Sequence, residues 1–139
     1  MAVESQIEKI AKTIKGARCL RGNVLVSFPK LHPRRRTELK EQLEAIRKTM
    51  CETFGGTTEW EGEGCWVDNS GRTICEPVRV YYSAHQCFDD AEKAEKFFET
   101  LKRVGREAEQ EAVFINAEGT SYIFSPSEEE KIEKKKKKK

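Results

Sequence analysis

Residues 57–82 contain the pattern that most restricts what this chain can fold into. A long alternating segment ends at Asp68, and a second segment, rich in β-branched and aromatic residues, begins after Gly71. Two such segments around a short loop predict a β-hairpin. If residues 69–71 form a three-residue loop, Gly71 takes the left-handed position of a type I turn with a bulge, and Asp68 pairs with Arg72.

The loop length decides which residues share a face of this hairpin. The register predicts four opposed pairs: Trp66 with Ile74, Gly64 with Glu76, Gly62 with Val78, and Trp60 with Val80. Both tryptophans then lie on the same side as the valines, and we expect that side to be the core. The opposite side carries the intervening residues: Glu59, Glu61, Glu63, Cys65, Cys75, Pro77, Arg79 and Tyr81. A loop of two or four residues would place the three glutamates against the valines, where unpaired charge is costly to bury.

Length and composition predict one compact domain with a heavily charged surface. The chain has 139 residues, of which 36% are charged and 37% hydrophobic. No segment approaches the roughly 20 apolar residues of a membrane span. The first residues lack the basic and then apolar pattern of a secretory signal, so we expect a cytoplasmic protein. The abundance of Glu and Lys resembles the surface of thermophile proteins.

The net charge depends on a lysine run at the end of the printed sequence. Removing the six lysines at 134–139 changes the formal charge from +2 to −4. The body is therefore mildly acidic, and the overall pI is no evidence that the fold binds nucleic acid. We expect residues 1–125 to form the domain and residues 126–139 to be a disordered, Lys-rich tail.

Five cysteines are spread along the chain without a Cys-x-x-Cys pair: Cys19, Cys51, Cys65, Cys75 and Cys87. An odd number without an export signal predicts reduced thiols. The absence of close cysteine pairs and of a His-x-x-x-His spacing argues against a structural zinc site. The alternative is a disulfide between Cys65 and Cys75, which the register places on the same face of adjacent strands, staggered against each other.

The remaining segments predict helices and strands on both sides of the hairpin. Helical apolar spacing marks residues 3–15, 37–54 and 89–105, with Asp89 and Glu92 forming a capping box and Gly105 ending the last helix. Strands are expected at 23–28, 110–115 and, at an edge, 120–124. Without the first helix and last strand, the order is βαββαβ. This predicts an α+β, ferredoxin-like sandwich, with the first and third strands central and one sheet face open.

Glu76 is the first candidate catalytic residue, because the register places it on the apolar face between Ile74 and Val78. An ionised carboxylate there is costly unless it has a partner, and Gly62 and Gly64 leave room for a ligand. Glu76 would then be a general acid/base or a ligand anchor with a raised pKa. The alternative is structural: a bulge at Pro77 turns it outward, or an arginine or helix N-terminus neutralises it.

Two further groups suggest a catalytic or metal site. Alternating Glu59, Glu61 and Glu63, with Glu111 on another strand, would bind a divalent cation or form a solvated sheet face. His85 and Cys87 follow the hairpin, and His32 follows the first strand; a Cys-His pair with Glu76 would supply a nucleophile, a base and an orienting group. No nucleophile elbow or phosphate-binding loop accompanies them.

The basic cluster of the body lies before the second predicted helix. Arg34, Arg35 and Arg36, with Lys30, would bind a phosphate or an acidic partner near the helix N-terminus. Aromatic side chains of the hairpin would stack on bases. The three glutamates, placed on the open face, oppose a phosphate backbone, and the signature of sheet-face RNA binders is absent.

Several short motifs between residues 55 and 115 are shared with a loosely defined set of proteins. They are Gly55-Gly56-Thr57, Glu61-Gly62-Glu63-Gly64-Cys65-Trp66, Gly71, Glu76-Pro77 and Gln110-Glu111-Ala112-Val113. The combination resembles small uncharacterised prokaryotic α/β proteins with a Gly-rich Trp hairpin and a Gln-Glu-x-Val strand. Some of those look like secreted lipoproteins, whereas this sequence lacks an export signal. The resemblance implies a small α/β domain, assigns no catalysis, and suggests that Trp66, Glu76, Gln110 and Glu111 meet in space.

These observations favour a protein that binds a partner or a small ligand, as a homodimer formed through an edge strand or the N-terminal helix. The ligand-binding residues would be Trp60, Gly62, Gly64, Trp66 and Gln110. One alternative is a hydrolase or nuclease-like enzyme that uses Glu76 with Glu63, Glu111 or His85 and a divalent metal. Another is a nucleic-acid accessory protein that acts through residues 34–36 and the tail. No cofactor is indicated.

Overall fold

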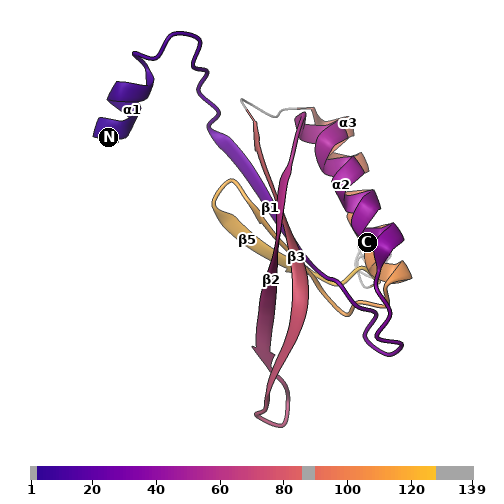
Figure 1. Ribbon diagram of the computed structural model, residues 1–139. Coiled ribbons are helices and arrows are strands. Elements are labelled where there is room, and N and C mark those ends of the chain that lie inside the picture. Colours follow the sequence, from indigo (N-terminus) through magenta and orange to yellow (C-terminus); the bar gives the residue numbers. More distant parts are fainter. Residues whose placement is uncertain (1–2, 86–89, 128–139) are drawn as a thin grey trace, which may run out of the picture.

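The computed structural model describes residues 3–85 and 90–127, which form three helices and five strands (Figure 1). The helices are α1 (Gln6–Ala11), α2 (Lys40–Phe54) and α3 (Ala91–Glu107). The strands are β1 (Gly22–Pro29), β2 (Thr58–Val67), β3 (Thr73–His85), β4 (Val113–Ala117) and β5 (Thr120–Phe124). The protein is thus an α+β protein, as the sequence predicts.

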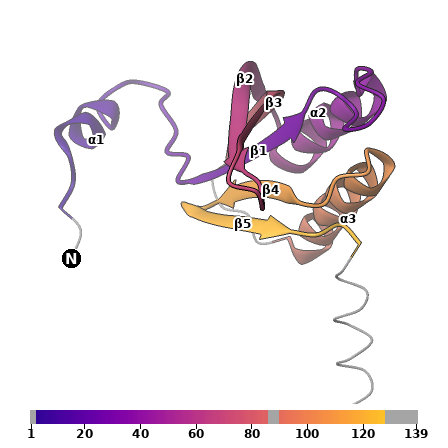
Figure 2. The same cartoon turned by 90° about the horizontal axis from the view of Figure 1, so that it is seen from below.

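The five strands form one antiparallel sheet in the order β2-β3-β1-β4-β5. Helices α2 and α3 lie together on one side of this sheet, and α1 lies apart from it on the other side (Figure 2). We call the sheet surface that faces away from α2 and α3 the open face. The end of the β2–β3 ribbon extends beyond the helices (Figure 1).

The hairpin has the register expected from the sequence. Trp66 is paired with Ile74, and Gly64 with Glu76. The loop is closed by a hydrogen bond from Asp68 N to Arg72 O, and Gly71 has a φ of 87°. The three-residue loop is therefore confirmed.

The prediction that the tryptophan and valine side of this hairpin faces the core is wrong. Val24, Val26 and Phe28 of β1 are buried under the helices, and the pairing of Val26 with Tyr81 puts Tyr81 on the same side. The Tyr81 hydroxyl donates a 2.9 Å hydrogen bond to the carbonyl of Leu43 on α2. The tryptophans and valines of the hairpin consequently face outward, and the glutamates share the side of the sheet that the helices cover.

The core lies between the sheet and the two long helices. Its buried side chains come from β1, α2, β3, α3 and β4 and from the residues that cap α2 and α3: Val24, Val26, Phe28, Leu39, Leu43, Ile46, Met50, Tyr81, Phe97, Leu101, Val104, Ala108, Val113 and Ile115. The alternating burial along β1 and the helical spacing on α2 and α3 bring these apolar stripes together. This packing holds the hairpin against α2 through β3.

Several helix boundaries differ from the sequence-based expectation. Helix α2 begins at Lys40 and not at residue 37, and Gly55 ends it in the left-handed conformation, as expected. Helix α3 is capped by Asp90, whose side chain accepts from Lys93 N, whereas Asp89 lies outside the described residues. Gly105 does not end α3. It lies inside the helix, and a larger residue would not fit there because an added Cβ would be 2.6 Å from the ring of Pro126.

The two ends of the described chain also differ from expectation. Helix α1 has only six residues, none of them buried, although the sequence predicted a helix over 3–15. Strand β4 begins at Val113 and not at Gln110. Pro126 is buried, and its carbonyl accepts a hydrogen bond from Arg106. Residues 128–139 of the expected tail lie outside the described residues.

Within the described part of the chain, no helix combines the length and the apolar character needed to cross a bilayer.

Candidate functional site

The open face of the hairpin presents aromatic side chains around a glycine gap. Trp60 and Trp66 of β2 are 46% and 47% exposed. Between them lie Gly62 and Gly64, paired with Val78 and Glu76 of β3. A Cβ on Gly64 would approach a Val78 methyl to 3.2 Å, against 3.8 Å for Gly62. The side chain of Val78, which is buried, therefore packs over the two glycines on the open face, between the two indoles.

Glu76 lies half-buried on this open face, as the register predicts. Burial raises the pKa of its carboxyl group above the ordinary value, and the charge of Arg36 opposes that shift. Among residues 3–85 and 90–127, no side chain donates a hydrogen bond to Glu76 or forms an ion pair with it. The carboxylate is thus free to receive a donor or a cation from outside the chain.

Two of the three glutamates of β2, Glu59 and Glu61, are paired with cations, which corrects the expectation of an open acidic row. Arg47 of α2 donates two hydrogen bonds to Glu59, at 2.9 and 2.6 Å. Lys30 and Arg79 bond to Glu61 at 2.6 and 3.0 Å. The hydrogen bonds from Arg47 lower the pKa of Glu59, and those from Lys30 and Arg79 lower the pKa of Glu61.

These ion pairs explain why glutamates can lie on the helix side of the sheet. Each carboxylate receives charged donors, so its desolvation is compensated. They also argue against a metal site built on Glu59 and Glu61, because their oxygens are already used. Glu111 does not join this row, since it lies in the turn before β4 and is exposed.

Cys65 and Cys75 form a disulfide, which corrects the expectation that these thiols are reduced. The two residues are directly opposed and not staggered, with a Cα–Cα distance of 4.1 Å. The bond lies in the part of the ribbon that extends beyond the helices, where both strands are mostly exposed. Isolated two-stranded ribbons are marginally stable, so the cross-link holds this end together. Cys19 and Cys51 are free and exposed.

The basic loop is partly neutralised by one acidic residue. Arg34 and His32 both contact the carboxylate of Glu109, the histidine at 2.7 Å through Nε2. Arg35 lies 4.0 Å from the same carboxylate. Arg34 and then His32 lower the pKa of Glu109. These contacts therefore hold the loop between β1 and α2 against the end of α3.

His32 is the anchor of this loop. It is 1% exposed, and its Nδ1 accepts hydrogen bonds from the backbone N–H groups of Arg34 and Arg35. Since Nδ1 is an acceptor, Nε2 carries the hydrogen and donates a hydrogen bond to the carboxylate of Glu109. Both ring nitrogens are therefore occupied, which gives the histidine a structural explanation.

The start of α2 offers mixed charge and not an anion site. A hollow of about 300 Å³ lies there, between the basic loop and the end of α3. Its lining includes both cations and carboxylates: Arg35, Lys40, Glu38, Glu41 and Glu107. The three carboxylates repel a phosphate group. The surroundings therefore do not support the prediction that a phosphate binds near the N-terminus of α2.

The structure does not bring the candidate catalytic residues together. His85 lies nine residues along β3 from Glu76, or roughly 30 Å in an extended strand. It contacts Glu118 at 2.6 Å and stacks on Phe54. Cys87 lies outside the described residues. Gln110 lies before β4, which begins at Val113, and its side-chain amide donates a hydrogen bond to the carbonyl of Ala108.

Three residues of structural importance are not indicated by any sequence motif. Tyr81, Arg47 and Glu109 each act through partners more than ten residues away. For Tyr81 the sequence does contain an indication. Apolar residues alternate at 24, 26 and 28 of β1, and the pairing of β1 with β3 puts Tyr81 on the same side of the sheet as these residues. The partners of Arg47 and Glu109 follow from tertiary packing alone.

No protein-family model and no curated protein sequence matches this chain. The fold is similar to that of a phage SAM lyase. Its complex with S-methyl-5'-thioadenosine has a TM-score of 0.56 and 13% identity, covering 78% of this chain and 91% of the lyase. Its apo form has a TM-score of 0.51 and 10% identity, covering 75% and 88%. A Bacillus cereus protein related to NIF3 has a TM-score of 0.46 and 15% identity, with coverage of 74% of this chain and 25% of its own.

Proposed function

We propose that this protein is a self-associating binding protein, in which the N-terminal segment of one copy docks on the open face of another. The observation that carries the proposal is the exposed aromatic surface of the sheet. Trp60, Trp66, Tyr82 and Ile123 all lie on the open face and are between 37% and 72% exposed. Large contiguous apolar surfaces on a protein commonly mark interaction sites.

A second unpaired apolar surface lies at the N-terminus. Val3, Ile7, Ile10 and Ile14 follow helical spacing and are 59% to 90% exposed. We call these four side chains the N-terminal stripe. Helix α1 has six residues, and a helix of this length is only marginally stable without packing contacts. Forming the helix therefore does not by itself remove the N-terminal stripe from water. Docking would stabilise both the helix and the surface that receives it.

Charge supports the match between these two surfaces. Residues 3–21 carry five basic and two acidic side chains. The strand residues that face the open side include one charged side chain, Glu76, for which the described chain supplies no cation partner. A lysine or arginine from the docking segment would compensate the buried carboxylate of Glu76.

A second copy of this chain fits the geometry better than internal docking. Helix α1 stands away from its own sheet (Figures 1 and 2). Reciprocal exchange between two copies would use both the stripe and the open face twice, which is the self-complementary interface of a C2 dimer. The dimer is therefore the expected assembly.

We further infer a ferredoxin-like arrangement for the part from β1 to β4. Strand order β2-β3-β1-β4, with two helices on one side, supports it, and β5 adds an edge strand beside β4. In such a sheet the face opposite the helices is available for association. We retain the cytoplasm as the expected compartment.

The test is the molecular mass of the full chain at several concentrations by analytical ultracentrifugation. Wild type should be a dimer that dissociates on dilution, and I7E/I10E should be monomeric, because two carboxylates cannot be buried against an apolar sheet. W60E should have the same effect from the other side of the interface. A matched control is K9Q/K15Q, which changes the net charge by the same amount but keeps the stripe; it should remain a dimer, with a weaker dependence on salt because fewer cations of the docking segment attract Glu76.

A monomeric wild type would contradict this proposal, as would a dimer that survives both I7E/I10E and W60E. Far-UV circular dichroism would show that each variant retains the wild-type fold.

A second candidate is a nucleoside-like ligand on the open face, with its base stacked on Trp60 or Trp66. The glycine gap leaves two indoles as stacking surfaces beside a carboxylate, and the fold is similar to a lyase solved with S-methyl-5'-thioadenosine. The probe is S-methyl-5'-thioadenosine itself, titrated while tryptophan fluorescence is followed. Saturable quenching that is lost in W60F and W66F would support the site, and an unchanged spectrum would exclude this ligand.

The geometry gives less support to the other two hypotheses. For a hydrolase, Glu76, His85 and Glu111 do not converge on a common point. For a nucleic-acid accessory protein, Arg34 is already paired with Glu109. The lysine tail lies outside the described residues, so its contribution stays a prediction.

A further inference from the structure

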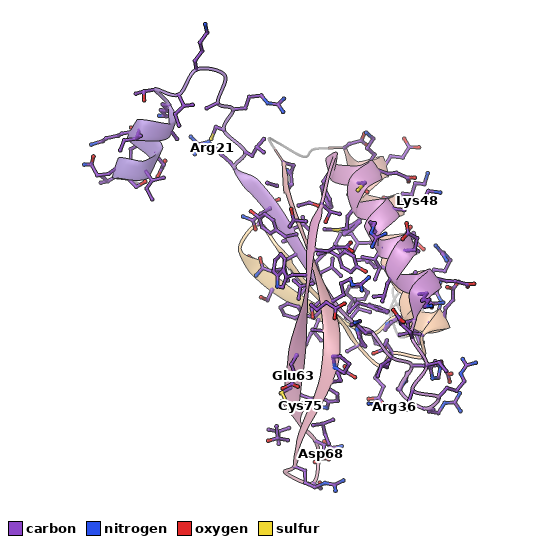
Figure 3. All side chains as sticks on the ribbon, viewed as in Figure 1. Arg21, Arg36, Lys48, Glu63, Asp68 and Cys75 are labelled. Atoms are coloured by element: carbon purple, nitrogen blue, oxygen red, sulfur yellow. A yellow bond between two sulfur atoms is a disulfide. The ribbon has the colours of Figure 1, made fainter. Side chains whose placement is uncertain are left out.

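The projecting end of the hairpin brings together one carboxylate and two cysteines. Glu63 and Cys65 are two residues apart on β2, so they share a face, and Cys75 is directly opposite Cys65 on β3. Figure 3 shows Glu63 and Cys75 close together on the ribbon, above the loop that contains Asp68. One ligand atom from each of the three residues lies within 4.8 Å of the other two.

Glu63 differs from the other glutamates of its strand. Glu59 and Glu61 are held by cations of α2, β3 and the basic loop. Glu63 faces Pro77 across the ribbon, and no cation of the described residues forms an ion pair with it. Its carboxylate oxygen Oε1 instead lies 3.8 Å from Cys65 Sγ. It is the acidic side chain of this row that remains available as a ligand.

We propose that, when the Cys65–Cys75 disulfide is reduced, these two thiolates and the Glu63 carboxylate bind a zinc ion. Thiol–disulfide exchange with a dithiol reductant breaks the S–S bond, leaving two thiols on this chain and a disulfide on the reductant. Binding of Zn²⁺ then releases the two thiol protons to solvent, because thiolates are the ligands. The metal itself changes no oxidation state.

The spacing of the three groups suits this ion. Two sulfurs at about 2.3 Å from a tetrahedral Zn²⁺ are about 3.8 Å apart, and a carboxylate oxygen at about 2.1 Å lies about 3.6 Å from either sulfur. Once the S–S bond is broken, the directly opposed cysteines need only small side-chain rotations to reach this separation. The measured 3.8 Å between Glu63 Oε1 and Cys65 Sγ is already close to the required value.

The site would be an open one. Three protein ligands leave the fourth tetrahedral position for water, and the three residues are exposed. The metal would also replace the covalent cross-link of the ribbon. Under oxidising conditions a disulfide would join β2 to β3, and under reducing conditions a metal ion would do so.

The experiment is a titration of the full chain with Co²⁺ and Zn²⁺ after reduction and removal of the reductant under anaerobic conditions. C19S/C51S/C87S is the working background, since it leaves Cys65 and Cys75 as its two cysteines. Reduced protein should bind one Co²⁺ per chain with the near-ultraviolet absorption of thiolate ligation, and Zn²⁺ should displace it. Oxidised protein should show neither signal.

Two variants locate the ligands. C65S/C75S in the same background should lose the absorption and the one-to-one binding. E63Q keeps both thiols and should weaken binding on the order of tenfold or more, since even indirect partners of metal ligands are worth about 10- to 100-fold in affinity. E61Q is the matched control, because Glu61 lies on the same strand face but is paired with Lys30 and Arg79, and it should bind as the background does.

The proposal is overturned if the reduced background binds no better than C65S/C75S. It is equally overturned if E63Q binds as tightly as E61Q. Circular dichroism on each variant separates loss of ligands from loss of fold, and E63Q, which removes no cross-link, keeps the test decisive even where C65S/C75S unfolds.

Discussion

The replacement of Tyr81 by Phe tests which face of the hairpin is buried. The Tyr81 hydroxyl is fully enclosed and donates to the carbonyl of Leu43 at 2.9 Å. Burial raises the pKa of Tyr81 above its ordinary range, so the hydroxyl remains a donor at any pH suitable for the assay. Phe keeps the ring in the core and removes this one hydrogen bond.

The magnitude follows from what happens to the two groups of that bond. The donor disappears, and the Leu43 carbonyl still has the N–H of Arg47 one turn ahead in α2 as a helical partner. The acceptor is therefore not left unsatisfied, and the free energy of unfolding should fall by about 1 kcal/mol. In urea this corresponds to a midpoint lower by about 0.5 M, and in a thermal scan to a Tm lower by about 3–4 °C.

The neighbouring residue supplies the control. Tyr82 lies on the open face and is 37% exposed, so Y82F should change the free energy of unfolding by less than about 0.5 kcal/mol. The measurement is urea denaturation of both variants and wild type, at one protein concentration because association affects stability. Equal losses in Y81F and Y82F, or a loss in Y82F alone, would refute the assignment of the buried face.

Three more predictions concern the charged residues and glycines of the ribbon. Because burial raises the pKa of Glu76, its ionised form costs free energy in the folded single chain. In the I7E/I10E background, where no segment docks on the open face, E76Q should be more stable to urea at pH 7 than the background itself. The gain should shrink as pH falls through the raised pKa and vanish below about 4.3, the ordinary pKa of Glu. Arg47 lowers the pKa of Glu59, so R47M should lose about 0.5 kcal/mol at pH 7, a difference that should disappear in urea melts as pH falls through the lowered pKa. G64A should be less stable to urea than G62A, because its new Cβ would lie 3.2 Å and not 3.8 Å from the nearest side-chain carbon; the reverse order would contradict this packing.

For the hairpin, local sequence information predicts the strand pairing correctly and the buried face wrongly. The turn chemistry of Asp68 and Gly71 determines the pairing of β2 with β3, and the structure has that pairing. The choice of buried face rested on the cost of burying unpaired glutamates. That cost is avoided because Arg47, Lys30 and Arg79 supply the missing partners.

The disulfide was the alternative to the expected reduced thiols, for a different reason. Cysteine spacing in the sequence predicts little about pairing across strands, and the odd number of cysteines favoured free thiols. Direct opposition of Cys65 and Cys75 follows from the register itself. The same pairing that joins Asp68 to Arg72 makes Cys65 and Cys75 an adjacent pair without a stagger.

The sequence by itself determined the elements of this protein: the hairpin and its loop, the two long amphipathic helices and the edge strand at its C-terminal side. These depend on turn residues, caps and apolar periodicity, which act over a few neighbouring positions. Only the tertiary structure decided which side of the ribbon is covered, which cations neutralise its glutamates, and that Glu76, His85 and Glu111 lie apart. Those outcomes depend on contacts between residues distant in the chain, and a side chain's position within its own strand does not specify the partner that packing brings to it.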